Sequence, residues 1–185
     1  MNEFRIEKTP IAVEVWTTDG DVRGFVHVAP FARSHSGFET VLDLLAAPEP
    51  FLPVTRDEGV DLFAKNSILA IRCPPQPEVP GLPVVERYGV VYLRGREAFV
   101  ATFRGERPPD KSRVIDFLNE DGPYVVTLHA GAQVVLAKQH LVRVVPMASV
   151  AMALDEVPAA KRQKAADVKA RAKKQPPKKK KKSKR

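Results

Sequence analysis

The residues of this sequence best suited to binding chemistry are basic side chains near its C-terminal end. Residues 159–185 hold 14 of the 30 lysines and arginines but only one of the 22 acidic residues, Asp167. Clustered cations neutralise phosphates and release counterions, which gives salt-dependent binding of DNA or RNA without sequence preference. The candidate nucleic-acid-binding residues are Lys161, Arg162, Lys164, Lys169, Arg171, Lys173, Lys174, Lys178, Lys179, Lys180, Lys181, Lys182, Lys184 and Arg185.

The rest of the chain has the opposite charge. Residues 1–158 carry 16 basic and 21 acidic residues, so a basic surface is not expected there. Residues 159–174 are rich in helix formers, but Val168 alone interrupts their polarity, so the apolar face of a membrane-binding helix is missing. The lysine run at 178–185 repels itself and is expected to be disordered. An acidic protein partner, another anionic surface and a role in solubility alone stay open as alternatives.

Catalytic and metal-binding patterns are missing from the sequence. His27, His35, His129 and His140 lie at no metal-ligand spacing, and Cys73 has no second cysteine to pair with. The phosphate loops GxGxxG and GxxxxGK[ST] and the nucleophile motif GxSxG do not occur. We therefore expect no catalytic residue, no metal, no cofactor and no enzymatic activity.

An internal repeat organises the chain. Residues 40–72 align without a gap onto residues 113–145 at a constant offset of 73. Six of these 33 pairs are identical, and the apolar positions stay in register throughout. A period of this kind is typical of duplicated structural units. We therefore interpret the chain as two copies of one small domain.

Two polar residues recur at equivalent positions of the repeat. Asp43 matches Asp116, and a pair of carboxylates could serve acid–base chemistry if one pKa were raised beside a base. Helix capping or an exposed helix face explains the aspartates more simply. Lys65 matches Lys138, and these lysines could either bind a phosphate or lie solvated in a turn.

Both copies show β-type alternation around one short helix. The strands of the first copy are expected at 11–17, 22–28, 51–54, 60–63 and 67–73, with a helix at 41–45. Those of the second copy are expected at 90–93, 98–103, 124–128, 133–136 and 141–145, with a helix at 112–119. Asp19-Gly20 is a hairpin turn signal, and Ser36 with Glu39 reads as a capping box for the first helix.

Five short strands in each copy predict a mainly β protein made of two tandem small barrels, since closure removes exposed strand edges. The first barrel repeat is expected at 1–74 and the second at 84–147. A stiff proline-rich linker at 75–83 separates them, and a helical-to-disordered basic tail follows at 148–185.

The ends of the two copies carry a family resemblance. Residues 62–71 and 135–146 look like the second motif of Sm-like proteins, and Lys138-Gln139-His140 before an apolar strand and Pro146 is similar to the ending of bacterial Hfq. The run 114–119 also resembles uncharacterised bacterial domains. The resemblance implies Sm-like or SH3-like barrels and an oligomer as one possible state. It carries no RNA-binding residue onto this chain, since the family's loop asparagine and stacking aromatic have no match.

The cysteine content and the longest apolar run indicate where in the cell the protein is expected. A single cysteine is typical of a reducing compartment, and the longest apolar run, 144–154, is too short to span a bilayer. We expect a cytoplasmic, non-enzymatic accessory protein, with association with the nucleoid as an option. Its β domains would contact proteins and its tail would bind nucleic acid. The alternative is an interaction scaffold with an incidental or surface-binding tail.

Overall fold

The computed structural model describes residues 7–32, 35, 37–75 and 84–152, and they form a mainly β structure. The first half contains β1 (Thr9–Thr17), β2 (Gly20–Val28), α1 (Val41–Ala46), β3 (Phe51–Arg56), β4 (Gly59–Ala64) and β5 (Ile68–Cys73). The second half contains β6 (Val84–Leu93), β7 (Phe99–Glu106), α2 (Val114–Leu118), β8 (Tyr124–His129), β9 (Ala132–Ala137) and β10 (Leu141–Met147). Short 3-10 turns precede α2, β5 and β10, at Pro109–Lys111, Lys65–Ser67 and Lys138–His140.

The ten predicted strands and the predicted helix of each half are present, with bounds that differ by at most three residues except that β6 begins six residues earlier than expected. In β1 the alternation buries Val13 and Val15 on one face, as the sequence pattern predicted. The β1–β2 hairpin turns at the expected place, where Gly20 has a φ of 135° that residues with a side chain rarely adopt. Local sequence therefore determines where these elements begin and end.

One local prediction was wrong. The N-cap of α1 is Thr40, whose hydroxyl accepts the N–H of Asp43 while the Asp43 carboxylate accepts the N–H of Thr40. Glu39 instead accepts the N–H of Ala29 at 2.7 Å, and Ser36 lies outside the described residues. The capping box thus starts four residues later than predicted. The two could be confused from the sequence because Thr40 and Asp43 have the same spacing as Ser36 and Glu39.

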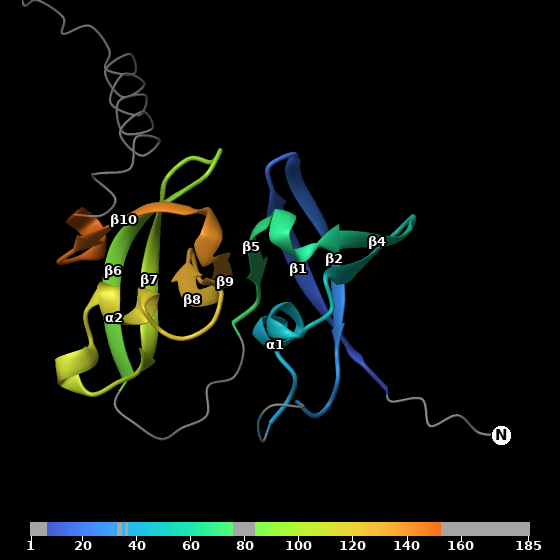
Figure 1. Cartoon of the computed structure of the whole chain (residues 1–185), viewed down its shortest axis with the longest axis horizontal. Helices are drawn as coiled ribbons and strands as arrows, with labels where there is room; N and C mark the ends of the chain where they lie inside the picture. The colour runs from blue at the N-terminus through green and yellow to red at the C-terminus, as the bar shows by residue number, and fades with distance from the viewer. Residues whose placement is uncertain (1–6, 33–34, 36, 76–83, 153–185) are drawn as a thin grey trace, which may run out of the picture.

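The ten strands form one open antiparallel sheet, so the expectation of two tandem barrels is not confirmed. The strand order is β10-β6-β7-β8-β9-β5-β1-β2-β3-β4. In each half the last strand pairs with the first strand of the same half. The two halves lie side by side and are joined where β5 pairs with β9 (Figure 1). The physical reason for the difference is that the backbone groups along the free edge of β5 pair with β9 of the other half.

The cores of the two halves are shared across this junction. One buried cluster combines Trp16, Leu69 and Ala70 of the first half with side chains of the second half such as Phe103 and Leu136. A second cluster belongs mainly to the first half and includes Val135 from β9. The halves therefore depend on each other for burial of apolar surface.

Both halves repeat the same order of elements. β3 and β8, β4 and β9, and the two 3-10 turns before β5 and β10 all correspond at the offset of 73 seen in the sequence. This match supports the interpretation of the chain as a tandem repeat. Residues 76–83 of the predicted linker and residues 153–185 of the predicted tail lie outside the described residues, so the domain boundaries stay predictions.

Candidate functional site

The predicted nucleic-acid-binding residues, Lys161 to Arg185, all lie outside the described part of the chain. The structure therefore brings none of them into a described site. What it does describe is the acidic body that precedes them. The question for this body is whether its polar groups form a site or serve the fold.

The repeated aspartates serve the fold. The Asp43 carboxylate accepts the backbone N–H of Thr40 at 2.8 Å, and Asp116 accepts that of Arg113 at 2.8 Å. Burial opposes ionisation of Asp43, but the hydrogen bonds from Thr40 and His35 lower its pKa below the usual value. A hydrogen bond from Arg113 likewise lowers the pKa of Asp116. Lowered pKa values are the opposite of what a general acid at neutral pH requires.

The repeated lysines also have a structural role, which neither sequence interpretation predicted. Lys65 is buried, and its Nζ donates to the carbonyl oxygen of Ala47, the residue that ends α1, at 2.8 Å. Lys138 donates in the same way to the carbonyl of Glu120, just after α2. Each lysine thus fixes the chain after its helix, where carbonyls lack helical partners. Recurrence at an offset of 73 was the only sequence signal for this role.

Each of the four histidines lies within hydrogen-bond distance of a partner on a different residue: Thr55 for His27, Asp43 for His35, Val100 for His129 and Asn66 for His140. His129 Nδ1 lies 2.7 Å from the Val100 carbonyl oxygen, and His140 Nε2 lies 2.8 Å from that of Asn66. Among the described residues, no group of three or more His, Cys, Asp or Glu side chains could hold a metal ion. Cys73 is buried, and burial raises the pKa of its thiol to about 11, so it is a poor nucleophile at neutral pH.

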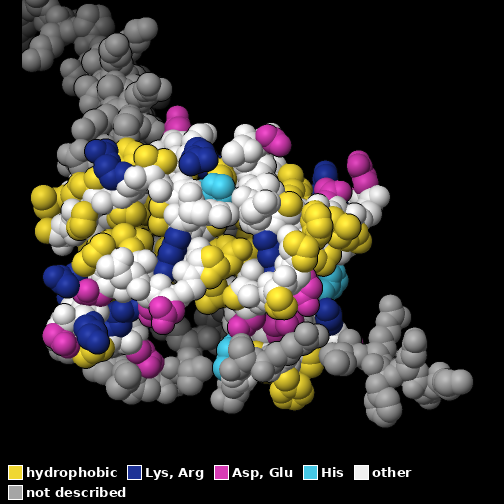
Figure 2. Space-filling view, viewed as in Figure 1, with side chains coloured by type: hydrophobic (Ala, Val, Ile, Leu, Met, Phe, Trp, Pro, Cys, Tyr) yellow, Lys and Arg dark blue, Asp and Glu magenta, His cyan; other side chains and the backbone are white. Residues whose placement is uncertain are grey.

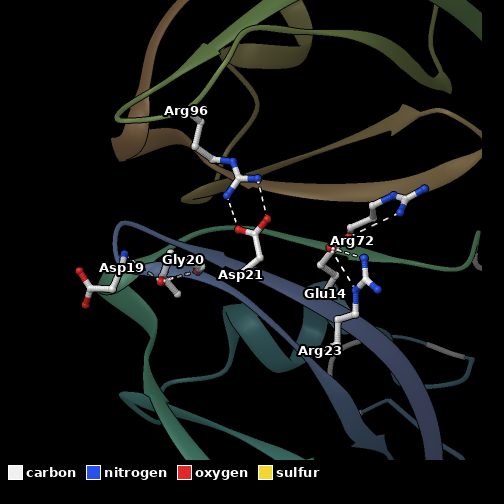
Figure 3. A network of polar contacts seen from close by, with 8 residues as sticks. Glu14, Asp19, Gly20, Asp21, Arg23, Arg72 and Arg96 are labelled. Atoms are coloured by element: carbon white, nitrogen blue, oxygen red, sulfur yellow. Dashed lines mark hydrogen bonds and ion pairs between the residues drawn. The ribbon is translucent and has the colours of Figure 1, made fainter.

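A polar contact between the halves stands out at the junction. The Arg96 guanidinium, from the β6–β7 turn, binds both carboxylate oxygens of Asp21 on β2 (Figure 3). The same guanidinium lies 4.3 Å from the ring centroid of Trp16, which meets Phe99 edge-on at 5.5 Å. The hydrogen bond from Arg96 lowers the pKa of Asp21. These contacts hold the two halves in their relative orientation. They could not be predicted from the sequence, because the residues lie far apart in the chain.

A hollow of about 670 Å³ lies between the first half and the β8–β9 turn of the second half, where Ala130, Gly131 and Ala132 line it. Its wall includes Glu14, which accepts from Arg23 at 3.2 Å and from Arg72 at 3.5 Å (Figure 3). Asp57 and Glu58 also line the hollow, so it carries both signs of charge. Its mixed charges therefore do not favour the binding of phosphates.

The two ends of the sheet are the more distinctive surfaces. Within the described residues, β4 pairs only with β3 and β10 pairs only with β6. Beside β4 the cross-strand pairs Phe25–Thr55 and Thr55–Val60 form one row, and Pro53–Leu62 forms the next. The exposed large apolar side chains of this region are Phe25, Phe51, Val60 and Leu62. Figure 2 shows hydrophobic side chains gathered at the end of the molecule where β4 lies.

Exposed apolar patches of this kind commonly mark contact sites for other proteins.

Comparison of the chain with protein-family models, curated proteins and solved structures found no match. No helix in the described ranges is long and apolar enough to cross a membrane.

Proposed function

We propose that this chain is a non-enzymatic accessory protein whose β body contacts protein and whose C-terminal segment binds nucleic acid without sequence preference. The observation that carries the proposal is the division of charge. Residues 159–185 hold 14 basic residues against one acidic residue, while residues 1–158 are net acidic. A net acidic body repels a polyanion, so binding is confined to the C-terminal segment.

The proposal for the body rests on its edges. Two free strand edges with exposed apolar side chains are suited to strand pairing with another chain. We also propose that each half is an Sm-like or SH3-like unit. The pairing of the last strand with the first in each half, after a 3-10 turn, supports that relationship.

The proposal is tested by changing the charge of the segment without changing its length. In one variant the 14 lysines and arginines of 159–185 are replaced by glutamine. In the matched control all residues of the segment are kept, but their order is scrambled. Anisotropy with a labelled duplex at low salt should show at least tenfold weaker binding for the glutamine variant and unchanged binding for the scrambled one. Equal binding by all three proteins would refute nucleic-acid binding by this segment.

A second candidate function is an interaction scaffold in which the basic segment is incidental or binds another anionic surface. The exposed apolar residues beside β4 favour it, because they need no nucleic acid to act. Under this alternative, deletion of residues 159–185 leaves the protein partners captured by the β body unchanged, and the glutamine variant captures the same partners.

A further inference from the structure

The loop that joins β2 to α1 is longer than its counterpart in the second half. It consists of residues 29–40, and we call it the phenylalanine loop, whereas residues 107–113 join β7 to α2. The second half reaches the same order of strands and helix with the shorter connection, so the fold does not require the longer one. The phenylalanine loop contains Phe31 and Phe38, while residues 107–113 contain no aromatic side chain.

The two phenylalanines of this loop are open to solvent. Phe31 is 77% exposed and Phe38 is 72% exposed, the highest values among the large apolar side chains that the structure describes as exposed. The loop extends beyond α1 at an end of the molecule (Figure 1), and Figure 2 shows hydrophobic side chains at that end. Contact of phenyl rings with water is unfavourable, so transfer of these rings into an apolar medium is favoured.

Hydrogen bonds hold the two arms of the phenylalanine loop together. At its base the Glu39 N–H donates to the carbonyl oxygen of Ala29 at 3.3 Å, and the Ala29 N–H donates to the Glu39 carboxylate at 2.7 Å. Farther along, the Ala32 N–H donates to the carbonyl oxygen of Gly37 at 2.8 Å. The two phenylalanines lie on opposite arms, between these bridges. The loop therefore presents both rings together and has little conformational freedom to lose on binding.

The ionisable residues at the tip of the loop are basic. Between the two phenylalanines the sequence contains Arg33 and His35 and no acidic residue. His35 Nε2 lies 3.0 Å from the carboxylate of Asp43, so the tip is also tied to α1. Rings that stack on nucleic-acid bases commonly lie beside a basic groove, whereas this tip is followed by the acidic Glu39 and Asp43. A projecting apolar pair with basic residues between is better suited to the interface of an anionic lipid bilayer.

We propose that this chain docks on anionic lipid membranes, with Phe31 and Phe38 inserted into the bilayer interface and the basic C-terminal segment held against the anionic headgroups. The segment carries 14 basic residues but no apolar face, and the loop supplies the apolar anchor that the segment lacks. A single weak anchor binds a membrane only marginally, whereas an apolar anchor combined with a polybasic segment binds stably.

The loop also depends on the basic segment. Residues 1–158 are net acidic and are repelled by an anionic surface, so the attraction that brings the loop to the membrane comes from residues 159–185. Both parts are therefore needed for docking. This lipid contact goes beyond the contacts with protein and nucleic acid proposed above.

The test measures co-sedimentation of the full-length chain with vesicles at physiological salt. The unmodified chain should bind vesicles of phosphatidylcholine mixed with phosphatidylglycerol, and it should bind pure phosphatidylcholine vesicles far more weakly. A variant carrying Phe31→Ser and Phe38→Ser should bind the mixed vesicles at least about tenfold more weakly, because it loses the burial of both phenyl rings. The glutamine variant of residues 159–185 should lose binding as well. Leu62→Ser, which removes an apolar side chain that is 67% exposed on β4, is the matched control and should bind as the unmodified chain does.

Tryptophan fluorescence gives a second reading, which reports insertion of the loop itself. Trp16 is the single tryptophan of the chain and is buried, so its emission provides a constant background. In the Phe31→Trp variant the added emission should shift to the blue on mixed vesicles and should be quenched by lipids with brominated acyl chains. In the Leu62→Trp variant, the matched control, the added emission should be neither shifted nor quenched.

The proposal is overturned if the unmodified chain does not bind the mixed vesicles, if the double serine variant binds them equally well, or if Leu62→Ser weakens binding to the same extent. Vesicle binding without quenching in the Phe31→Trp variant would overturn the insertion of the loop. The double serine variant keeps all 14 basic residues of 159–185, so its binding of duplex DNA should be unchanged. If it instead lost nucleic-acid binding and kept vesicle binding, the loop would belong to a nucleic-acid site and the lipid proposal would be wrong. Failure of this proposal is thus distinguished from failure of nucleic-acid binding by the basic segment.

Discussion

Arg96 and Asp21 are 75 positions apart in the chain, yet their side chains make a two-pronged ion pair across the junction of the halves. Arg96 also covers the face of Trp16, whose ring is buried between the halves. No local pattern in the sequence pointed to these residues, because their relation exists only once β5 has paired with β9. For the repeated Asp43 and Asp116, by contrast, helix capping was one of the predicted roles, and it is confirmed. It could be predicted because capping depends on neighbours three residues away.

Replacing Asp21 with asparagine is expected to lower the free energy of unfolding by about 0.5–1 kcal/mol at pH 7, a modest figure because solvent screens this partly exposed pair. The hydrogen bond from Arg96 holds the pKa of Asp21 below its usual 3.8. The stabilisation is therefore complete above that value and is lost as the pH falls through the lower pKa of the folded state. Urea unfolding of both proteins from pH 7 to pH 2 measures the difference.

The matched control for this pH dependence is Asp19→Asn, on the adjacent turn, where no ion pair to the second half is formed by the described residues. Its effect should be small at every pH. A difference between the Asp21→Asn variant and the unmodified chain that persisted undiminished to pH 2 would contradict the role assigned to the ion pair.

Lys65→Met should cost about 1–3 kcal/mol, because it leaves the partly buried carbonyl oxygen of Ala47 without its donor. Burial lowers the pKa of Lys65. Lys138→Met is the paired comparison, and it should cost less because Lys138 is more exposed. Equal midpoints of urea unfolding for the Lys65→Met variant and the unmodified protein would rule out this structural role.

At the scale of elements, alternation and turn residues predicted the ten strands and both helices because these signals are local. The first residue of α1 was predicted correctly, but its capping box was misassigned, since Ser36–Glu39 and Thr40–Asp43 offer the same capping spacing. Sheet closure was also misjudged, because the choice between a closed barrel and a shared sheet depends on which edge β5 meets. That choice is made between residues more than 60 positions apart, such as Ala70 and Leu136.

The unequal burial of equivalent strands leads to an element-scale prediction. Leu69→Ala on β5 should destabilise the chain by about 2–5 kcal/mol, since Leu69 is fully buried in the core shared by the halves. Val142→Ala, at the equivalent position of β10, should change stability by less than about 0.5 kcal/mol. Both are measured by urea unfolding of the full-length chain. Equal costs at the two positions would show that the halves are not joined through β5 and β9.

At the scale of the whole molecule, the chain divides into a net acidic body and a basic C-terminal segment. A polyanion is therefore expected to contact the segment and to be repelled by the body.

The most direct test of the central claim is the dependence of duplex binding on salt for the full-length chain and its glutamine-substituted variant. Binding by the basic segment predicts a steep linear fall of log K with log salt concentration, with a slope of about −0.9 for each phosphate neutralised. The glutamine variant should show weak binding with a slope near zero. A shallow slope for the full-length chain, or the same steep slope for both proteins, would contradict the claim that residues 159–185 bind nucleic acid.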